Sequence, residues 1–136
     1  MLSIGELSKR TGVKVPTIRY YEQKGLLVAP ERSEGNQRRY GDEELRRMSF
    51  IRHSRQLGFS IEDIRELLEL SQHPKKPCRD AHGIANSHLR EVQDRISKLQ
   101  RLEGELKRIS KCEADSIVKC AVIETLADHS LCETEH

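Results

Sequence analysis

Two glycines constrain the fold of this chain more than any other feature, because they divide the stretch Thr11–Tyr40 into short segments. Gly12 stands where two short helices have to turn sharply, and Gly25 ends the second of them. A helix over Val15–Gln23 fits between the two, with Pro16 in its first turn, where a missing N–H is tolerated. The spacing therefore predicts the turn and second helix of a helix-turn-helix.

The second helix carries a mixed set of side chains. Ile18 can point inward, while the other positions offer cations, hydrogen-bond donors, a methyl group and a flat ring: Lys14, Thr17, Arg19 and Tyr20. Such a set suits a helix laid in a DNA major groove, where phosphates need cations and base edges need donors or methyl groups. The competing interpretation is a small helical hairpin with a solvated face, because Arg and Tyr are common on surfaces.

A two-stranded wing is expected next, over Val28–Tyr40. Pro30, Gly35 and Asn36 mark its turns. The edge of this hairpin is basic and aromatic, through Arg32, Arg38, Arg39 and Tyr40.

Charge is distributed unevenly along the chain. Residues 1–58 hold twelve Lys and Arg against seven Asp and Glu, whereas residues 59–136 hold twelve against fifteen. The N-terminal half is therefore the expected nucleic-acid face, because neutralising phosphates supplies most non-specific affinity. A third helix, capped by Asp42, is predicted in this half. Arg52 and Arg55 lie three residues apart on one side of it, where both could reach a backbone phosphate.

A length of 136 residues allows one compact domain with an extension. Ser3 with Glu6 forms a capping-box pattern at the first helix, and Ile61–Ser71 reads as a fourth helix. We expect a mostly α domain over residues 1–72. Residues 73–80, which contain a proline-bracketed break, form a hinge.

A long amphipathic helix is predicted over residues 81–111. Apolar side chains recur at three- and four-residue spacing on an otherwise charged surface: Leu89, Val92, Ile96, Leu99, Leu102, Leu106 and Ile109. Some 30 helical residues extend about 45 Å, so this seam needs a partner. The simplest partner is a second copy of the chain, parallel or antiparallel, and the alternative is an intramolecular hairpin. Residues 112–136 read as a loop, a short apolar helix over Ala121–Ala127 and a polar tail.

The chain is expected in the cytoplasm, because no apolar run approaches membrane-spanning length and no signal-peptide core is present. Its four cysteines then occupy a reducing compartment, where structural disulfides are disfavoured. Metal binding or thiol redox sensing becomes the natural interpretation. An enzyme is not expected, because the sequence lacks a base–nucleophile pair and a phosphate-cradling motif.

Three segments resemble the MerR family of bacterial transcription regulators. They are IGELSKRTGVKVPTIRYYEQKGLL, the RSEGNQRRY wing and FIRHSRQLGFSIEDIRELL, which span Ile4–Leu68 almost without a gap. The long helix, the break at Cys78 and the loop Cys112–Cys120 are similar to the metal-sensing branch of that family, which contains cadmium, lead and zinc sensors. The resemblance implies a winged helix-turn-helix domain, a long dimerisation helix and a short C-terminal metal-binding loop and helix.

The resemblance also implies a function. In the family, a homodimer straddles a near-palindromic promoter whose spacer is too long for RNA polymerase to engage both promoter elements. The metal-free dimer represses, whereas the metal-bound dimer kinks and untwists the DNA and activates genes of metal resistance or efflux. The matched positions imply DNA contacts from Arg19, Tyr20, Arg38, Tyr40 and Arg55, with Arg39 beside them in the wing.

The cysteines lie where such a sensor needs them. Cys112 and Cys120 bracket a seven-residue loop, long enough to bring two sulfurs onto one ion. Cys120 starts a short helix, whose N–H groups favour a thiolate. In an antiparallel coiled coil the start of one helix meets the end of the other. Cys78 of one protomer would then complete the site made by Cys112 and Cys120 of its partner.

Three thiolates select soft or borderline ions over Mg2+ or Ca2+. Two thiolates alone would suit linear Cu(I), and the loop resembles that of copper(I) sensors, which usually have Ser in place of Cys78. The third cysteine therefore favours Cd2+, Pb2+, Zn2+ or Hg2+. His88 or Cys132 could add a ligand. The alternatives are ordinary buried thiols, or a redox sensor in which Cys112 and Cys120 form a disulfide.

Overall fold

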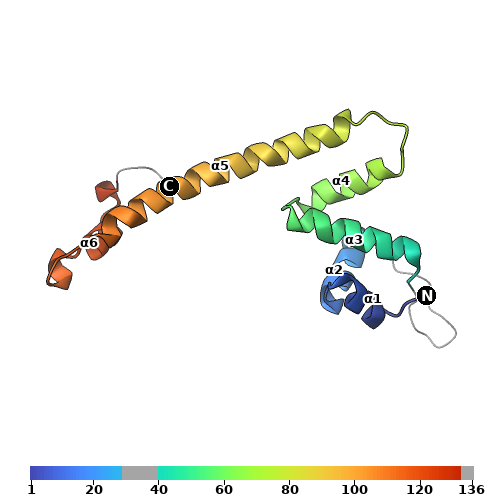
Figure 1. The fold of residues 1–136 in the computed structure, drawn as a ribbon, viewed down its shortest axis with the longest axis horizontal. Helices are drawn as coiled ribbons and strands as arrows, with labels where there is room; N and C mark the ends of the chain where they lie inside the picture. Colours follow the sequence, from blue (N-terminus) through green and yellow to red (C-terminus); the bar gives the residue numbers. More distant parts are fainter. Residues whose placement is uncertain (29–39, 133–136) are drawn as a thin grey trace. The chain divides into compact units, whose positions relative to one another are not determined.

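A computed structural model describes residues 1–28 and 40–132, and these residues are mostly helical, as the sequence predicted (Figure 1). They fall into two compact units, residues 1–84 and 85–136. In chain order the elements are α1 (Ile4–Thr11), α2 (Val15–Gln23), α3 (Asp42–Gln56), α4 (Ile61–Ser71), α5 (Arg79–Ser110), the 3-10 turn η1 (Ile117–Lys119), α6 (Ala121–Ala127) and the 3-10 turn η2 (His129–Leu131).

The helix-turn-helix forms where the sequence placed it. The Ser3 hydroxyl accepts the backbone N–H of Glu6 at 3.2 Å, and the Glu6 carboxylate accepts the N–H of Ser3 at 3.3 Å, so the capping box is confirmed. Gly12 ends α1 with a φ of +74°, and Gly25 follows α2 with a φ of +76°. Side chains with a Cβ rarely adopt this left-handed conformation, which explains why glycine stands at both turns.

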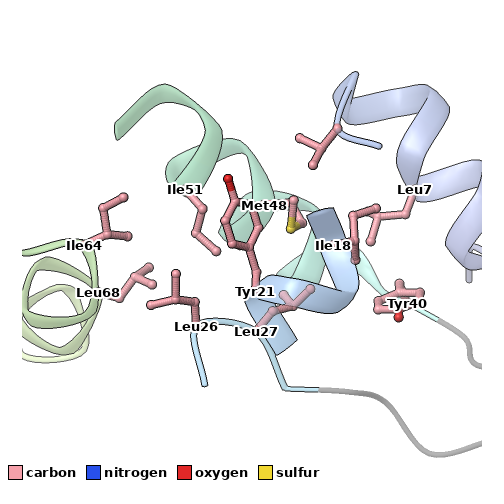
Figure 2. Close-up of a cluster of buried hydrophobic side chains, with 11 residues drawn as sticks. Leu7, Ile18, Tyr21, Leu26, Leu27, Tyr40, Met48, Ile51, Ile64 and Leu68 are labelled. Atoms are coloured by element: carbon pink, nitrogen blue, oxygen red, sulfur yellow. The ribbon is translucent and has the colours of Figure 1, made fainter. Parts of the chain in front are cut away.

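Apolar side chains from α1 to α4 meet in one core (Figure 2). Ile18 of α2 points inward, as predicted, and has no exposed surface. The other residues without exposed surface are Leu7, Leu26, Tyr40, Met48, Ile51 and Ile64. Because Ile18 fixes which face of α2 is buried, it also fixes which face of α2 meets solvent.

The segment between α2 and α3 departs from the sequence prediction at its end. Tyr40 pairs with Leu2 in an isolated antiparallel bridge, with N–H to C=O distances of 2.7 and 2.6 Å. The cap of α3 is Gly41 and not Asp42, because the Gly41 N–H donates to the Glu44 carboxylate at 2.8 Å. The rest of the expected wing, with Arg32, Arg38 and Arg39, lies outside the described residues.

The C-terminal unit contains most of α5 together with η1, α6 and η2. The bounds of α6 are those that the sequence predicted. The apolar positions of α5 are largely exposed in the single chain: Leu89 51%, Ile96 50%, Leu99 63% and Leu106 61%. Near the end of α5, the Arg108 guanidinium binds the Glu105 carboxylate at 2.9 Å and the Leu131 carbonyl at 3.1 Å. None of the helices in the described part of the chain has the length and apolarity to cross a membrane.

Candidate nucleic-acid interface and metal centre

The outer face of α2 presents the side chains expected of a DNA-reading helix. Lys14, Arg19 and Tyr20 are exposed, and Thr17 is half-buried. Tyr20 is 43% exposed, and the Lys24 ammonium lies 5.6 Å from the centroid of its ring. This arrangement places a cation beside a flat ring on the surface, which suits contact with phosphate and with a base or sugar.

Tyr40 was expected to contact DNA, but its position in the structure argues against this role. The side chain has no exposed surface, and its hydroxyl donates a hydrogen bond to the Glu22 carboxylate of α2. Figure 2 places its ring within the core cluster. Tyr40 therefore joins the start of α3 to α2 inside the domain, and we remove it from the set of candidate DNA contacts.

Arg52 and Arg55, which were expected to reach phosphates, both have partners within the chain. Arg52 donates to the Thr11 carbonyl at 2.5 Å, and Arg55 donates to the Phe59 carbonyl at 2.8 Å. No local sequence pattern indicated the first contact, because its partners lie 41 residues apart. The first contact satisfies a carbonyl at the end of α1, which lacks an intrahelical donor, and the second joins α3 to the link that leads into α4.

The Cys112 and Cys120 side chains are hydrogen-bond partners, and their joint binding of one ion stays a prediction. The Cys112 sulfur accepts the backbone N–H of Ala121, the first residue of α6, at 3.1 Å. This hydrogen bond lowers the pKa of Cys112, and two further hydrogen bonds act in the same direction, one from the N–H of Ala114 and one from the Cys120 thiol. Partial burial and the Glu124 carboxylate oppose them. The net effect favours a thiolate, which is the form that binds metals.

The helix N-terminus acts on a different sulfur from the one expected. Cys120 is the N-cap residue of α6, but its side chain makes no capping hydrogen bond. The first N–H of the helix donates instead to Cys112, which lies nine residues away in the chain. Sequence reasoning missed this because a backbone donor carries no residue-type signal, and only the fold of the loop brings Cys112 to the helix.

The remaining candidate ligands lie in separate environments. Cys78 is exposed and directly precedes α5. The His88 side chain is 11% exposed, with Nδ1 3.9 Å from the Glu91 carboxylate. Cys132 is half-buried at the end of η2. Within residues 1–28 and 40–132 of a single chain, no three metal-ligating side chains gather at one point.

Comparison with known proteins gives matches along nearly the whole chain. The model of the MerR HTH family regulatory proteins matches residues 2–71, and the model named "MerR, DNA binding" matches residues 45–109. The HTH-type transcriptional regulator ZntR of Escherichia coli K12 is 42% identical over 130 residues, which cover 93% of this chain and 92% of that protein. The mercuric resistance operon regulatory protein of Pseudomonas fluorescens is 37% identical over 127 residues, covering 92% and 87%.

A solved structure also matches in fold. The transcription regulator PbrR691 from Ralstonia metallidurans CH34, in complex with lead(II), superposes with a TM-score of 0.80 at 36% identity, covering 93% of this chain and 99% of that chain. Both α5 and the loop that carries Cys112 and Cys120 fall within the length over which these relatives match.

Proposed function

The chain belongs to the MerR family of helix-turn-helix regulatory proteins, and on that premise we propose that it regulates transcription in response to a soft divalent metal ion. The family consists of transcriptional regulators and not of enzymes, in agreement with the sequence prediction. The metal-free homodimer would bind a palindromic promoter and repress it. The metal-bound dimer would distort the same DNA, so that RNA polymerase can use both promoter elements of a metal-resistance or efflux gene.

The DNA-binding part of the proposal rests on α2. Ile18 anchors the helix in the core, so Lys14, Arg19 and Tyr20 share the solvent side with the edge of Thr17. We assign these four side chains, and Arg55 in the last turn of α3, to the promoter contact. Arg38 and Arg39 of the wing, which lie outside the described residues, complete the set by resemblance.

The metal part rests on the pair Cys112 and Cys120, which is the observation that carries the proposal. Two adjacent thiols, one of them with a lowered pKa, provide ligands suited to soft ions and poorly suited to Mg2+ or Ca2+. Relatives named for mercuric resistance and for a lead(II) complex support an ion of this class. We propose Cys78 of the partner subunit as the third ligand, with His88 and Cys132 as optional ones, and Cd2+, Pb2+ or Zn2+ as the ion.

The link from the site to the rest of the C-terminal unit runs through α6. Because the first N–H of α6 donates to the Cys112 sulfur, the position of that sulfur and the position of the helix depend on each other. An ion held by thiolates of both subunits would supply a fixed bond between them. Metal binding can shift the equilibrium between the repressing and the activating conformation of the dimer only by the difference in metal affinity between these two conformations. Such coupling is typically about 5- to 150-fold, and promoter DNA with the activated shape should raise metal affinity by the same factor.

The proposal is tested with single Cys→Ser variants, titrated with Cd2+ under reducing conditions and used in promoter transcription in vitro. Cys78→Ser, Cys112→Ser and Cys120→Ser should each abolish tight binding of one ion per protomer and abolish induction, while promoter binding persists. Cys132→Ser tests the optional ligand, because retained binding leaves a complete site of three cysteines and lost binding adds Cys132 to the ligand set.

Three other outcomes would point elsewhere. Retained binding of Cu(I) but not Cd2+ by Cys78→Ser would favour a copper(I) sensor. Induction by oxidant without metal, lost in Cys112→Ser, would favour a thiol redox sensor. Loss of promoter binding in Cys112→Ser would contradict the separation of the two functions.

A further inference from the structure

Three arginines of α3 and α4 reach across the N-terminal unit to backbone carbonyls of the helix-turn-helix. Arg52 of α3 donates to the Thr11 carbonyl at 2.5 Å. Arg47, also of α3, donates from Nε to the Leu26 carbonyl at 2.6 Å, and Arg65 of α4 donates to the carbonyl of Lys24. All three contacts join residues that lie 21 or more positions apart in the chain.

Two of the acceptors, the carbonyls of Thr11 and Lys24, lie at the C-terminal ends of helices, and the third lies in the turn after α2. Thr11 is the last residue of α1, Lys24 is the C-cap of α2, and Leu26 follows two residues later. Carbonyls at such ends lack an intrahelical N–H and carry the negative end of the helix dipole. A guanidinium satisfies both needs, and its planar fork holds the geometry better than an ammonium does.

Arg52 also closes over the turn itself. A Cβ placed on Gly12 would lie 3.1 Å from Nη1, 3.2 Å from Cζ and 3.3 Å from Nη2 of Arg52. The guanidinium therefore packs against the glycine that separates α1 from α2 while it bonds the carbonyl just before that glycine. The absence of a side chain at Gly12 is thus needed twice, for its φ of +74° and for this contact.

We propose that Arg52 is a positioning residue, which fixes the recognition helix α2 through the α1–α2 turn and makes no contact with a DNA phosphate. Arg47 and Arg65 act in the same way at the other end of α2. The inference rests on the proposed DNA-binding role of α2, and it revises the expectation that Arg52 meets the DNA backbone. Part of the positive charge of the N-terminal half then serves the geometry of the helices.

Salt dependence distinguishes a positioning residue from a phosphate contact. The logarithm of the binding constant falls with the logarithm of salt concentration, with a slope of about 0.9 for each neutralised phosphate. A change present in both protomers of a dimer therefore alters the slope by about 1.8 if it removes one phosphate contact from each. A change that only disturbs the position of α2 lowers affinity and leaves the slope unaltered.

The experiment uses the full chain and a duplex recovered from a random-sequence pool by the wild-type protein. Arg52→Met keeps the apolar stem, and Arg52→Lys keeps the charge without the planar fork. Both should bind at least tenfold more weakly, because each protomer loses one charged hydrogen bond, and both should keep the wild-type slope. Arg19→Met is the matched control. Because Arg19 is exposed on α2 and proposed to contact DNA, this variant should bind DNA with a shallower salt dependence.

A shallower slope for Arg52→Met, or wild-type affinity for Arg52→Lys, would overturn the inference, because a phosphate accepts a lysine as readily as an arginine. Unfolding in urea tests the positioning role of Arg52 independently of DNA binding. The midpoint should fall for both Arg52 variants and stay at the wild-type value for Arg19→Met, and unchanged midpoints for the Arg52 variants would also overturn the inference. Failure of the wild-type protein to select any duplex would count against the proposed function alone.

Discussion

Replacing Gly12 with Ala should destabilise the N-terminal unit more than replacing Gly25 with Ala. The two glycines have nearly the same backbone conformation, with φ of +74° and +76°. Forcing an L residue into it costs about 1–2 kcal/mol at either site. The surroundings differ, because a Cβ at Gly25 would meet nothing within 4 Å, whereas one at Gly12 would meet the Arg52 guanidinium at 3.1–3.3 Å.

The difference between the two variants should therefore report the contact of Arg52 with the Thr11 carbonyl. A hydrogen bond to a charged group contributes about 1.5–3 kcal/mol. Displacing the guanidinium by a few tenths of an ångström weakens this bond or breaks it, so Gly12→Ala should cost about 1–3 kcal/mol more than Gly25→Ala. Urea unfolding at one fixed protein concentration measures both costs, since the stability of a dimer depends on concentration.

A double-mutant cycle separates the contact from the backbone strain. In the Arg52→Met background, Gly12→Ala should cost no more than Gly25→Ala does in the wild type, because only the strain is left. Equal costs of the two glycine variants in the wild type would show that the Arg52 contact adds no stability. An extra cost of Gly12→Ala that persists after Arg52 has been replaced would show that this cost does not arise from the contact.

Two further predictions follow from hydrogen bonds in the two units. Alkylation of Cys112 by iodoacetamide should have a pH midpoint below the usual thiol value, because the N–H of Ala121 lowers its pKa, and Glu124→Gln should lower the midpoint further because the Glu124 charge raises that pKa. Mass spectrometry of the peptide that contains Cys112 measures the extent of alkylation at each pH. An alkylation midpoint that Glu124→Gln leaves unchanged would contradict the prediction. Tyr40→Phe should lower the unfolding free energy by about 1.5–3 kcal/mol, because it removes a hydrogen bond to the Glu22 carboxylate. It should not weaken DNA binding at a temperature where the protein stays folded. Weaker DNA binding by Tyr40→Phe at unchanged stability would indicate that Tyr40 contacts DNA after all.

Local signals made much of the fold predictable from sequence. Helix ends follow from contacts between near neighbours, such as the hydroxyl of Ser60, which accepts the N–H of Asp63 at 3.1 Å and starts α4 where expected. The inward position of Ile18 follows from periodicity alone. The family resemblance rests on the same stretch of chain and is confirmed by the matching family models.

Contacts between distant residues were not predictable in the same way. The sequence pattern indicates that Tyr40 is an exposed aromatic residue at the end of a basic hairpin. In the structure it is buried in the core, and its hydroxyl donates a hydrogen bond to Glu22. The sequence pattern indicates that Arg52 contacts a phosphate, because its neighbours in the chain do not predict its hydrogen bond to the distant Thr11 carbonyl. At the cysteine pair, the adjacency follows from loop length, whereas the assignment of the helix N–H to Cys112 depends on the path of the loop.

We propose that the metal site uses cysteines of two subunits, and mixed dimers distinguish this arrangement from a site within one chain. One subunit carries Cys78→Ser and the other carries Cys112→Ser, with different affinity tags so that only the mixed dimer is purified. In a shared site, Cys78 of the second subunit and both loop cysteines of the first are intact. We expect one tightly bound Cd2+ per mixed dimer and none in either parent homodimer. A mixed dimer that binds no Cd2+ would contradict it.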